Sequence, residues 1–430
     1  MLDFFSYSCN LESESELYEA RSEMLERTLK NVIESVSQSF PVLILTGPRQ
    51  VGKTTLLASC ASKNRSYVTL DDLEERALAK NDPALFLQMH KTPLIIDEVQ
   101  YAKELFSYIK IHVDKHQNPG DFWLTGSQKF HLMKGITESL AGRVAIIDML
   151  GLSAKEMSGK AQASIPFLPT NEWISDAREN QSLLSQIDII FEKIWLGSFP
   201  KLATGGREQR EIFYKSYVQT YLERDVKSIL SIGDELSFYK FLRATAARTG
   251  QLLNYSELAR DVDIDQKTAK SWLSILKTSG LVYLLEPYYN NITKRIIKTP
   301  KLYFLDTGLC AFLTGWDSPK TLEAGAMSGA IFETYVFGEI LKSYWHNGKD
   351  PLVYFYRDSD QREIDFVFES NGTLFPVEVK KTATPSLTAT KSFSALHTLK
   401  KTIGMGAVIC MREKDVPLSR EITTIPIGYL

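Results

Sequence analysis

Residues 47–54, Gly-Pro-Arg-Gln-Val-Gly-Lys-Thr, constrain the fold of this chain more than any other segment. Two glycines separated by four residues and followed at once by lysine and threonine match the pattern G-x-x-x-x-G-K-[ST]. An apolar stretch, Val42–Leu45, precedes the motif, and a segment with helical character, 54–61, follows it. In such a unit the glycines let the loop curl, so that successive backbone N–H groups point towards one anion. The motif therefore predicts a phosphate-binding loop at the carboxyl end of a buried strand.

The residue types in this loop favour a nucleoside triphosphate, and we expect ATP with Mg²⁺. The amino end of the following helix attracts phosphate, Lys53 reaches the β and γ phosphates, and the Thr54 hydroxyl binds Mg²⁺. A chance glycine-rich turn beside a lysine is the alternative, and the strand before it and the helix after it argue against that. The expected nucleotide-contacting residues are Gly47, Pro48, Arg49, Gln50, Val51, Gly52, Lys53, Thr54 and Thr55.

Two acidic residues end a second apolar segment, Leu94-Ile95-Ile96-Asp97-Glu98. The carboxyl ends of parallel strands face the same crevice, so these acids are expected to lie beside the phosphate loop. Asp97 is then a candidate for the magnesium shell, and Glu98 for polarising the attacking water. The alternative is a pair of solvated acids at a strand end.

A third strand end carries Thr125-Gly126-Ser127. Ser127 or Thr125 is expected to hydrogen-bond the γ-phosphate or the attacking water, although an ordinary turn also explains Gly126-Ser127. Arg143 is a candidate for stabilising the charge on the transferring phosphate, either within one chain or from a neighbouring subunit. A single arginine before a strand is also typical of a surface group, and this alternative stays open.

Short apolar segments recur between residues 40 and 150 at a spacing of some twenty residues or more. This spacing predicts βα units and an α/β fold, with a parallel sheet covered by helices on both faces. A helix over 22–36 is expected to pack on that sheet. The expected strands are Val42–Thr46, Tyr67–Leu70, Pro93–Ile96, Phe122–Thr125 and Val144–Met149.

Composition limits the cellular setting and the partners. The formal net charge is −2, so any site for a polyanion must be a local patch. No apolar run reaches the length of a membrane span, so no membrane partner is expected. Residues 1–20 are acidic and lack the basic start of a secretory signal, and the four cysteines form no CxxC pair. These features favour a cytoplasmic protein without a disulfide framework.

The middle of the chain predicts a loop over 159–186, helices over 187–230, and a winged helix-turn-helix over 235–300. A short helix, a turn, the helix 266–279 and a strand follow one another there. Lysines on the second helix and on the following hairpin, which has four cations through Lys301, can neutralise DNA backbone phosphates. The alternative is a packing or dimerisation unit with solvated lysines. The candidate DNA contacts are Lys267, Lys270, Lys294, Arg295 and Lys298.

Carboxylates near the carboxyl end form a second candidate site. Asp365 lies in one expected strand, while Glu378 and Lys380 share one face of the next. If the strands are adjacent, these residues converge, and Glu333 on the helix 332–344 can join them. Two carboxylates can hold Mg²⁺ while the lysine orients or deprotonates a water for phosphodiester attack. Plain ion pairs are the alternative.

The chain from about residue 22 resembles prokaryotic AAA-type ATP-binding proteins that carry a C-terminal domain of unknown function. The resemblance rests on the phosphate loop, Asp97-Glu98, 124–127, 139–143, 221–225, 300–309 and 378–380. Glu333, Asp365 and Glu378-x-Lys380 are similar to a restriction-endonuclease-type nuclease core. The implied organisation is an extension (1–21), an AAA-type core (22–157), a loop and helical linker (158–234), the winged helix (235–300) and an α/β nuclease-like domain (301–430).

The favoured hypothesis is a protein that binds and hydrolyses ATP and couples its nucleotide state to the C-terminal domain, with DNA as a candidate partner. The alternative is a nucleotide-gated switch or scaffold that turns over little ATP, recruits a protein partner or another copy of itself, and carries an inactive nuclease-like domain.

Overall fold

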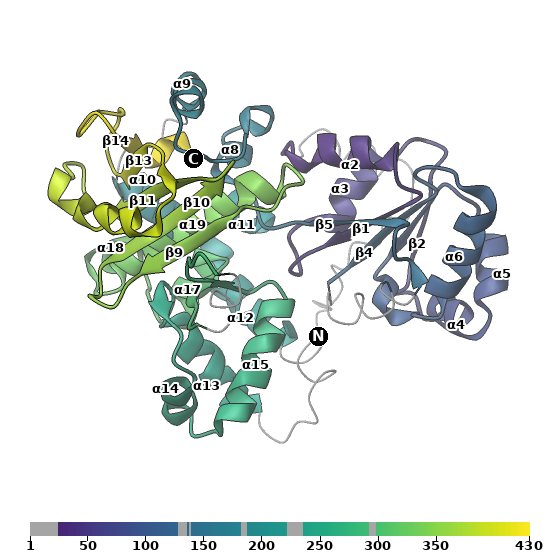
Figure 1. Cartoon of the computed structure of the whole chain (residues 1–430). Coiled ribbons are helices and arrows are strands. Elements are labelled where there is room, and N and C mark those ends of the chain that lie inside the picture. Colours follow the sequence, from purple (N-terminus) through teal and green to yellow (C-terminus); the bar gives the residue numbers. More distant parts are fainter. Residues whose placement is uncertain (1–24, 128–135, 137–138, 182–186, 222–234, 292–297) are drawn as a thin grey trace.

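Five short strands form one parallel sheet in the order β2-β3-β4-β1-β5 (Figure 1). The computed structural model describes residues 25–127, 136, 139–181, 187–221, 235–291 and 298–430. The strands are β1 Val42–Thr46, β2 Ser66–Thr69, β3 Leu94–Asp97, β4 Phe122–Gly126 and β5 Val144–Asp148. Each lies within one residue of its expected bounds, and the α/β fold is confirmed.

Helices cover both faces of this sheet, because successive side chains of a strand point to opposite sides. Leu43 and Leu45 of β1 pack in one apolar cluster with α2 and α3, while Val42 and Ile44 pack in another with α5 and α6. The expected helix over 22–36 begins later, because α2 starts at Leu29, and residues 22–24 lie outside the described ranges. The helices here are α2 Leu29–Ser37, α3 Lys53–Cys60, α4 Leu73–Asn81, α5 Pro83–Met89, the short η1 Val99–Tyr101 and α6 Leu105–His116.

The segment expected as a loop over 159–186 contains a helix, α9 Asn171–Glu179, and that expectation is corrected. Its apolar side chains Trp173, Ile174 and Ala177 recur with helical spacing and are buried. The Thr170 hydroxyl caps the helix by accepting a hydrogen bond from the backbone of Trp173. The neighbouring elements are α8 Ala154–Met157, η2 Ala161–Ala163, α10 Ile187–Leu196, α11 Pro200–Ala203, η3 Arg207–Gln209 and α12 Arg210–Tyr221.

Residues 235–291 and 298–304 form a helical unit, here called the middle unit, whose three strands make an antiparallel sheet in the order β6-β8-β7. Residues from Lys301 onward were expected to belong to the C-terminal domain. Instead Lys301 pairs with Leu252 on one side and with Leu285 on the other, so β8 is the central strand of the middle unit's sheet. The elements are α13 Glu235–Ala246, β6 Gln251–Leu252, α14 Tyr255–Asp261, α15 Gln266–Thr278, β7 Val282–Leu285 and β8 Lys301–Phe304.

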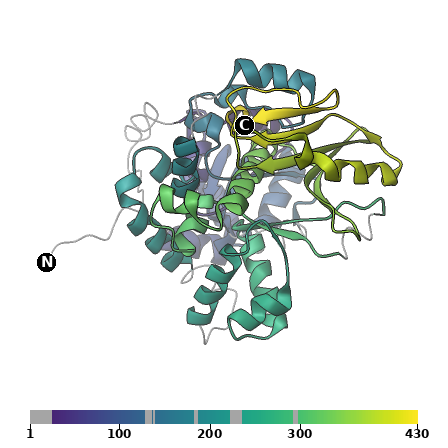
Figure 2. The same ribbon diagram turned by 90° about the vertical axis from the view of Figure 1, so that its left-hand side faces the viewer.

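The carboxyl-terminal part combines a long helix, α19 Ser328–Trp345, with a mixed sheet in the order β14-β13-β11-β10-β9 (Figures 1 and 2). The segment 387–399 is a 3₁₀ helix, η5, and β14 is the edge strand of this sheet beside β13. The other elements are α17 Thr307–Leu313, α18 Pro319–Ala324, β9 Val353–Arg357, β10 Glu363–Ser370, β11 Thr373–Lys380, η5 Leu387–Leu399, β12 Thr402–Ile403, β13 Gly406–Cys410, β14 Ile422–Pro426 and η6 Ile427–Tyr429.

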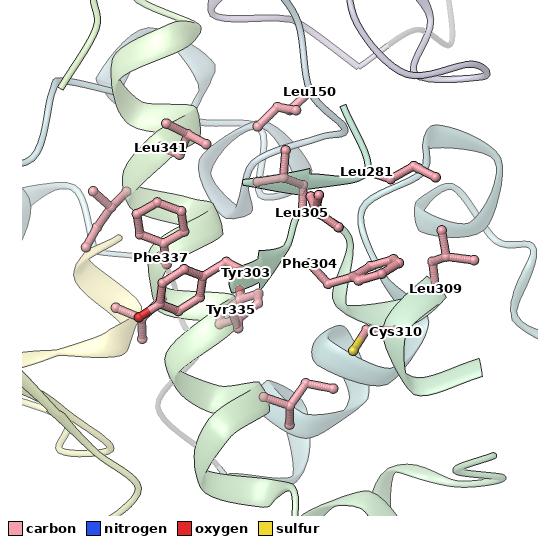
Figure 3. Close-up of a cluster of buried hydrophobic side chains, with 14 of the residues drawn as sticks. Leu150, Leu281, Tyr303, Phe304, Leu305, Leu309, Cys310, Tyr335, Phe337 and Leu341 are labelled. Carbon is pink, nitrogen blue, oxygen red and sulfur yellow. The ribbon is translucent and has the colours of Figure 1, made fainter. Parts of the chain in front are cut away.

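Aromatic packing fixes β8 against α19 and the C-terminal sheet. The rings of Tyr303 and Phe337 stack with centroids 4.5 Å apart, and Phe337 stacks on Phe366 of β10 at 5.6 Å. Figure 3 shows Tyr303 and Phe337 side by side in this core, with Leu305 beside them. The middle unit and the C-terminal sheet therefore share one apolar core. Among the helices in the described part of the chain, none has both the length and the apolar character that a membrane span needs.

Candidate functional site

The loop after β1 has the shape that the sequence motif predicts. Gly47 has φ of +146°, and a Cβ atom there would lie 2.0 Å from the carbonyl oxygen of Met149, so only glycine fits. Gly52 has φ of +92° and begins α3 as its N-cap. The buried Lys53 ammonium donates to the carbonyls of Gly47 and Pro48 at 3.0 and 2.8 Å. A close-fitting glycine loop with a lysine at its centre suits a phosphate chain.

Side chains from the start of α3 and from the carboxyl ends of β3 and β4 meet beside this loop. The Thr54 hydroxyl donates to Asp97 Oδ1 at 2.8 Å, and the Thr125 hydroxyl donates to the same oxygen. Burial raises the pKa of Asp97, and the hydrogen bonds from Thr125 and Thr54 offset part of that rise. A hydroxyl and a carboxylate oxygen held together are hard ligands of the kind that Mg²⁺ prefers. The two residues expected to hold magnesium therefore lie side by side.

Glu98 takes a left-handed backbone conformation, with φ of 55°, directly after β3. Its backbone N–H donates to Thr125 Oγ1 at 3.1 Å, and its carboxylate oxygen Oε2 accepts from the amide of Gln100 and from Ser127 Oγ, the latter at 3.4 Å. Ser127 therefore contacts Glu98 and Thr125 contacts Asp97. A non-glycine residue in this conformation is common where a side chain is positioned for function.

Sequence reasoning missed four side chains of this site. The Tyr67 hydroxyl donates to Asp97 Oδ2 at 3.2 Å, and burial raises the pKa of Tyr67. The Thr46 hydroxyl donates to Asp148 Oδ1 at 2.5 Å, where β1 and β5 end. Gln100 holds Glu98 as described above. Asp148 ends an expected strand of the same sheet, so its position at the carboxyl edge was the available signal. Tyr67 lies near the start of β2, and only its long side chain reaches Asp97.

Arg143 does not join this site within the chain, and that expectation is corrected. It precedes β5, and its carbonyl accepts a hydrogen bond from the backbone of Val42 at the amino end of β1. The phosphate loop follows the opposite end, roughly 16 Å away for a five-residue strand. Its guanidinium instead pairs with Asp114 of α6, with Nε 2.5 Å from Oδ1. A role towards a neighbouring subunit stays a prediction.

A buried ionic network joins the phosphate loop to α19. Arg27 donates to the carbonyls of Val51, in the loop, and Leu150, at 3.2 and 2.8 Å. Its Nε lies 3.2 Å from Glu156 Oε1, and Nδ1 of His346, just after α19, lies 3.3 Å from that oxygen. Burial alone raises the pKa of Glu156, but the neighbouring charges and donated hydrogen bonds outweigh it and hold the pKa well below its usual range.

A second contact between these parts involves Glu339 and Lys342 of α19. The backbone N–H of Ala154 donates to Glu339 Oε2 at 2.7 Å, and the Lys342 ammonium donates to the carbonyl of Leu152 at 3.0 Å. The two α19 side chains also pair with each other at 2.8 Å. The segment that leaves β5 is therefore tied to the helix that carries Glu333.

The structure brings the predicted C-terminal residues together. Asp365 Oδ2 accepts a hydrogen bond from the backbone of Val379 at 2.8 Å, and Lys380 Nζ lies 2.6 Å from Glu378 Oε1. Burial and the Asp365 carboxylate raise the pKa values of both Glu333 and Glu378. Among the described residues, no three acidic, histidine or cysteine side chains are arranged to hold a metal ion. We call Glu333, Glu363, Asp365 and Glu378 the acid cluster.

Lys301 lies inside this acid cluster, which sequence reasoning missed. Only 3% of the residue is exposed. Its Nζ lies 2.5 Å from Glu363 Oε1, 3.4 Å from Glu333 Oε1 and 3.8 Å from Asp365 Oδ1. Although burial lowers the pKa of Lys301, the three carboxylates raise it more, so the side chain stays an ammonium. The expected basic surface of the hairpin therefore loses one of its four cations.

The structure describes three of the five candidate DNA contacts. Lys267 and Lys270 are exposed on α15, and Lys298 is exposed just before β8. The Lys270 ammonium lies 5.4 Å from the ring centre of Tyr255. Lys294 and Arg295 lie outside the described residues. The three described lysines stay predicted phosphate contacts.

Comparisons with known proteins divide the chain in a similar way. A family model described as an AAA domain matches residues 39–158, and two models described as domains of unknown function, DUF8612 and DUF4143, match 187–320 and 328–430. The uncharacterized protein Rv2008c of Mycobacterium tuberculosis is 31% identical over 398 residues, covering 91% of this chain and 81% of that protein. The uncharacterized protein Mb2031c of Mycobacterium bovis matches with the same identity and coverage.

Solved structures resemble the chain more distantly. The Walker-type ATPase PABY2304 of Pyrococcus abyssi aligns with a TM-score of 0.41 and 15% identity, covering 68% of this chain and 97% of that one.

Proposed function

Because this chain belongs to the family of the mycobacterial proteins Rv2008c and Mb2031c and carries an AAA-type P-loop ATPase domain, we propose that it hydrolyses ATP to control the acid cluster. One observation carries the hydrolytic part of this proposal. Thr54, Asp97, Glu98 and Thr125 come from three neighbouring segments and are joined by hydrogen bonds beside the phosphate loop.

Each of these side chains has a distinct task in the proposed reaction. Lys53 and the loop amides bind the β and γ phosphates and offset their charge. Thr54 and Asp97 would hold the magnesium ion, which neutralises phosphate oxygens when bound. Glu98 orients the attacking water and accepts its proton, while Gln100 and Ser127 hold the carboxylate in place.

The network of Arg27, Glu156 and His346 supports coupling between the two ends of the molecule. Arg27 contacts the carbonyl of Val51 in the phosphate loop, and His346 follows directly on α19. A shift of the loop on nucleotide binding therefore changes a buried charge pair that also holds α19. Because α19 carries Glu333, the acid cluster is proposed to respond to nucleotide. We further propose that this nuclease-like part meets DNA, with Lys267, Lys270 and Lys298 as phosphate contacts.

A second candidate function is a nucleotide-gated switch that binds a protein partner and has no nuclease activity. One observation favours it: the ammonium of Lys301 already pairs with three carboxylates of the acid cluster. A DNA-cleaving site needs those carboxylates for metal ions and water. The two candidates differ in whether plasmid DNA is nicked in Mg²⁺ or Mn²⁺.

Steady-state ATP hydrolysis by the full chain tests the proposal. Lys53→Ala should lose ATP binding and turnover together, because the central phosphate contact is removed. Glu98→Gln should keep ATP binding within a few-fold but lower kcat by about 10²–10⁴, since only proton acceptance is lost. Glu104→Gln, a substitution of a glutamate before α6, is the matched control and should leave kcat unchanged.

The assay is repeated with single- and double-stranded DNA. An ATP hydrolysis rate that rises with DNA supports the proposal that the chain acts on DNA. A rate that is the same with and without DNA favours the switch that binds a protein partner. Turnover that survives Lys53→Ala at the wild-type rate contradicts the assignment of this site.

A further inference from the structure

Four carboxylates and three cations meet where the middle unit contacts the C-terminal sheet. The carboxylates are those of the acid cluster, and the cations are Lys301, Lys380 and Arg357, whose Nη1 lies 3.2 Å from Glu363 Oε2. The carboxylates therefore outnumber the cations, and their crowding helps to raise the pKa values of Glu333 and Glu378. A buried excess of acid favours a further positive charge, which is supplied by a proton or by a metal ion.

Glu378 identifies where that cation would be held. Its side chain is about nine-tenths buried, and its Oε1 pairs with Lys380. Within the described ranges, its other oxygen, Oε2, is buried and accepts no hydrogen bond. The backbone of Val379, the residue after Glu378, donates to Asp365, and Lys301 contacts both Asp365 and Glu333, so these acids lie near one another. A buried carboxylate oxygen without a donor is a ready ligand for a hard cation.

The ammonium of Lys301 stands on the other side of the same carboxylates. Lys301 comes from β8, the central strand of the middle unit's sheet, and Tyr303, two residues on, donates from its hydroxyl to Glu333 Oε1 at 2.5 Å. Two side chains on one face of β8 thus engage acids that belong to α19 and β10. Figure 3 shows Tyr303 in the core between β8 and α19.

We propose that Lys301 is the resident cation of the acid cluster, and that a divalent metal ion binds Glu333, Asp365 and Glu378 only when β8 withdraws this ammonium. This inference rests on the proposed function of the acid cluster and adds its regulation. The middle unit then acts as an internal inhibitor of the C-terminal domain. A lysine on a fixed strand competes with free metal at a high effective concentration, so its removal strengthens metal binding without any new ligand.

Mn²⁺ binding by the full chain, without ATP or DNA, tests this inference and is independent of turnover. Lys301→Met should bind Mn²⁺ at least about tenfold more tightly than the wild type, measured by calorimetry or electron paramagnetic resonance. Lys301→Arg keeps the positive charge and should bind as the wild type does. Lys298→Met, at an exposed lysine three residues earlier, is the matched control and should also leave affinity unchanged.

A double variant tests whether the extra Mn²⁺ affinity of Lys301→Met comes from Glu378. Glu378→Gln in the Lys301→Met chain should return Mn²⁺ affinity to the wild-type value. If Lys301→Met binds no more tightly than Lys298→Met, Lys301 is a structural ion pair and the inference is wrong. ATP hydrolysis is measured in the same variants. If its rate equals that of the wild type, the proposal that the chain hydrolyses ATP stands whether or not Lys301 inhibits metal binding.

Amine acylation followed by mass spectrometry measures the accessibility of Lys301 in the wild-type chain. The inference can therefore be tested even if the Lys301 variants misfold. On the wild-type chain, millimolar Mn²⁺ should increase the labelling of Lys301 several-fold relative to Lys298, because metal displaces the buried ammonium. Equal labelling with and without Mn²⁺ would overturn the inference.

Discussion

Gly47 lies at a point of the nucleotide site that has no room for a side chain. An alanine Cβ would lie 2.0 Å from the carbonyl oxygen of Met149, and φ of +146° is also unfavourable for alanine. Gly47→Ala must therefore displace the loop, and we expect ATP affinity to fall by about tenfold or more, since positioning errors near 1 Å are that costly. Titration calorimetry with the folded chain measures this change.

Gly142→Ala is the matched control for this prediction. Gly142 also has a positive φ, +75°, but no atom in the described part of the chain lies within 4 Å of a Cβ built there. The control variant therefore carries backbone strain without the clash. ATP binding that is equally weak in both variants would show a general loss of structure, rather than an effect of the contact between residue 47 and Met149.

Individual residues differ in how well sequence alone places them. Lys53, Thr54 and Asp97 were predictable because a local motif and the parallel sheet fix their common edge. Lys301 was not, because its place among the acids depends on β8 lying beside α19 and β10, which no local pattern encodes. Its neighbours in the sequence are basic, so it was grouped with Lys294, Arg295 and Lys298 as a surface cation.

At the scale of elements, Glu156 holds α2, α8 and α19 together. Its carboxylate accepts from the backbone N–H groups of Thr28 and Ser153 at 2.9 and 2.8 Å and pairs with Arg27 and His346. Glu156→Gln leaves Arg27 as a buried charge without its counter-ion. We expect the free energy of unfolding to fall by about 3–5 kcal/mol, measured by urea denaturation at neutral pH.

The pH dependence of that difference has a definite sign. The pKa of Glu156 is depressed in the folded chain relative to its ordinary value of 4.5. Its contribution to stability is therefore complete above 4.5 and is lost progressively as the pH falls below that value. The gap between wild type and Glu156→Gln should shrink on acidification, whereas Glu172→Gln, at an exposed residue of α9, should show no gap at any pH. A gap that widens in acid contradicts the ion-pair assignment.

Elements were predictable where one pattern dominated and were missed where two patterns competed. The five strands of the parallel sheet are short apolar runs and appear within a residue of their expected bounds. In α9, small polar residues and nearby prolines obscured the helical spacing of Trp173, Ile174 and Ala177. Arg143 was misplaced for a different reason, because its position before β5 already put it at the amino edge of the sheet.

At the scale of the whole molecule, the nucleotide loop is a meeting point of distant parts of the chain. Arg27 of the amino-terminal segment contacts Val51, and a Cβ built on Gly52 would lie 3.9 Å from Pro200. Gly280, just after α15 of the middle unit, faces Pro48, since a Cβ there would lie 3.1 Å from two ring carbons of that proline. The middle unit therefore touches both the nucleotide loop and, through Lys301, the acid cluster.

This arrangement predicts that a small change at the end of α15 alters nucleotide binding. Gly280→Ala, at φ of +70°, must push Pro48 or α15 by a few tenths of an ångström, and we expect about fivefold weaker ATP binding by calorimetry. Gly250→Ala is the matched control, because it has a similar φ, +74°, but ordinary contact with Ala330 in place of the loop. If both variants bind ATP as the wild type does, the middle unit rests against the loop without influencing it. If only Gly280→Ala binds weakly, the same unit that carries Lys301 also influences nucleotide binding, as the coupling between ATP and the acid cluster requires.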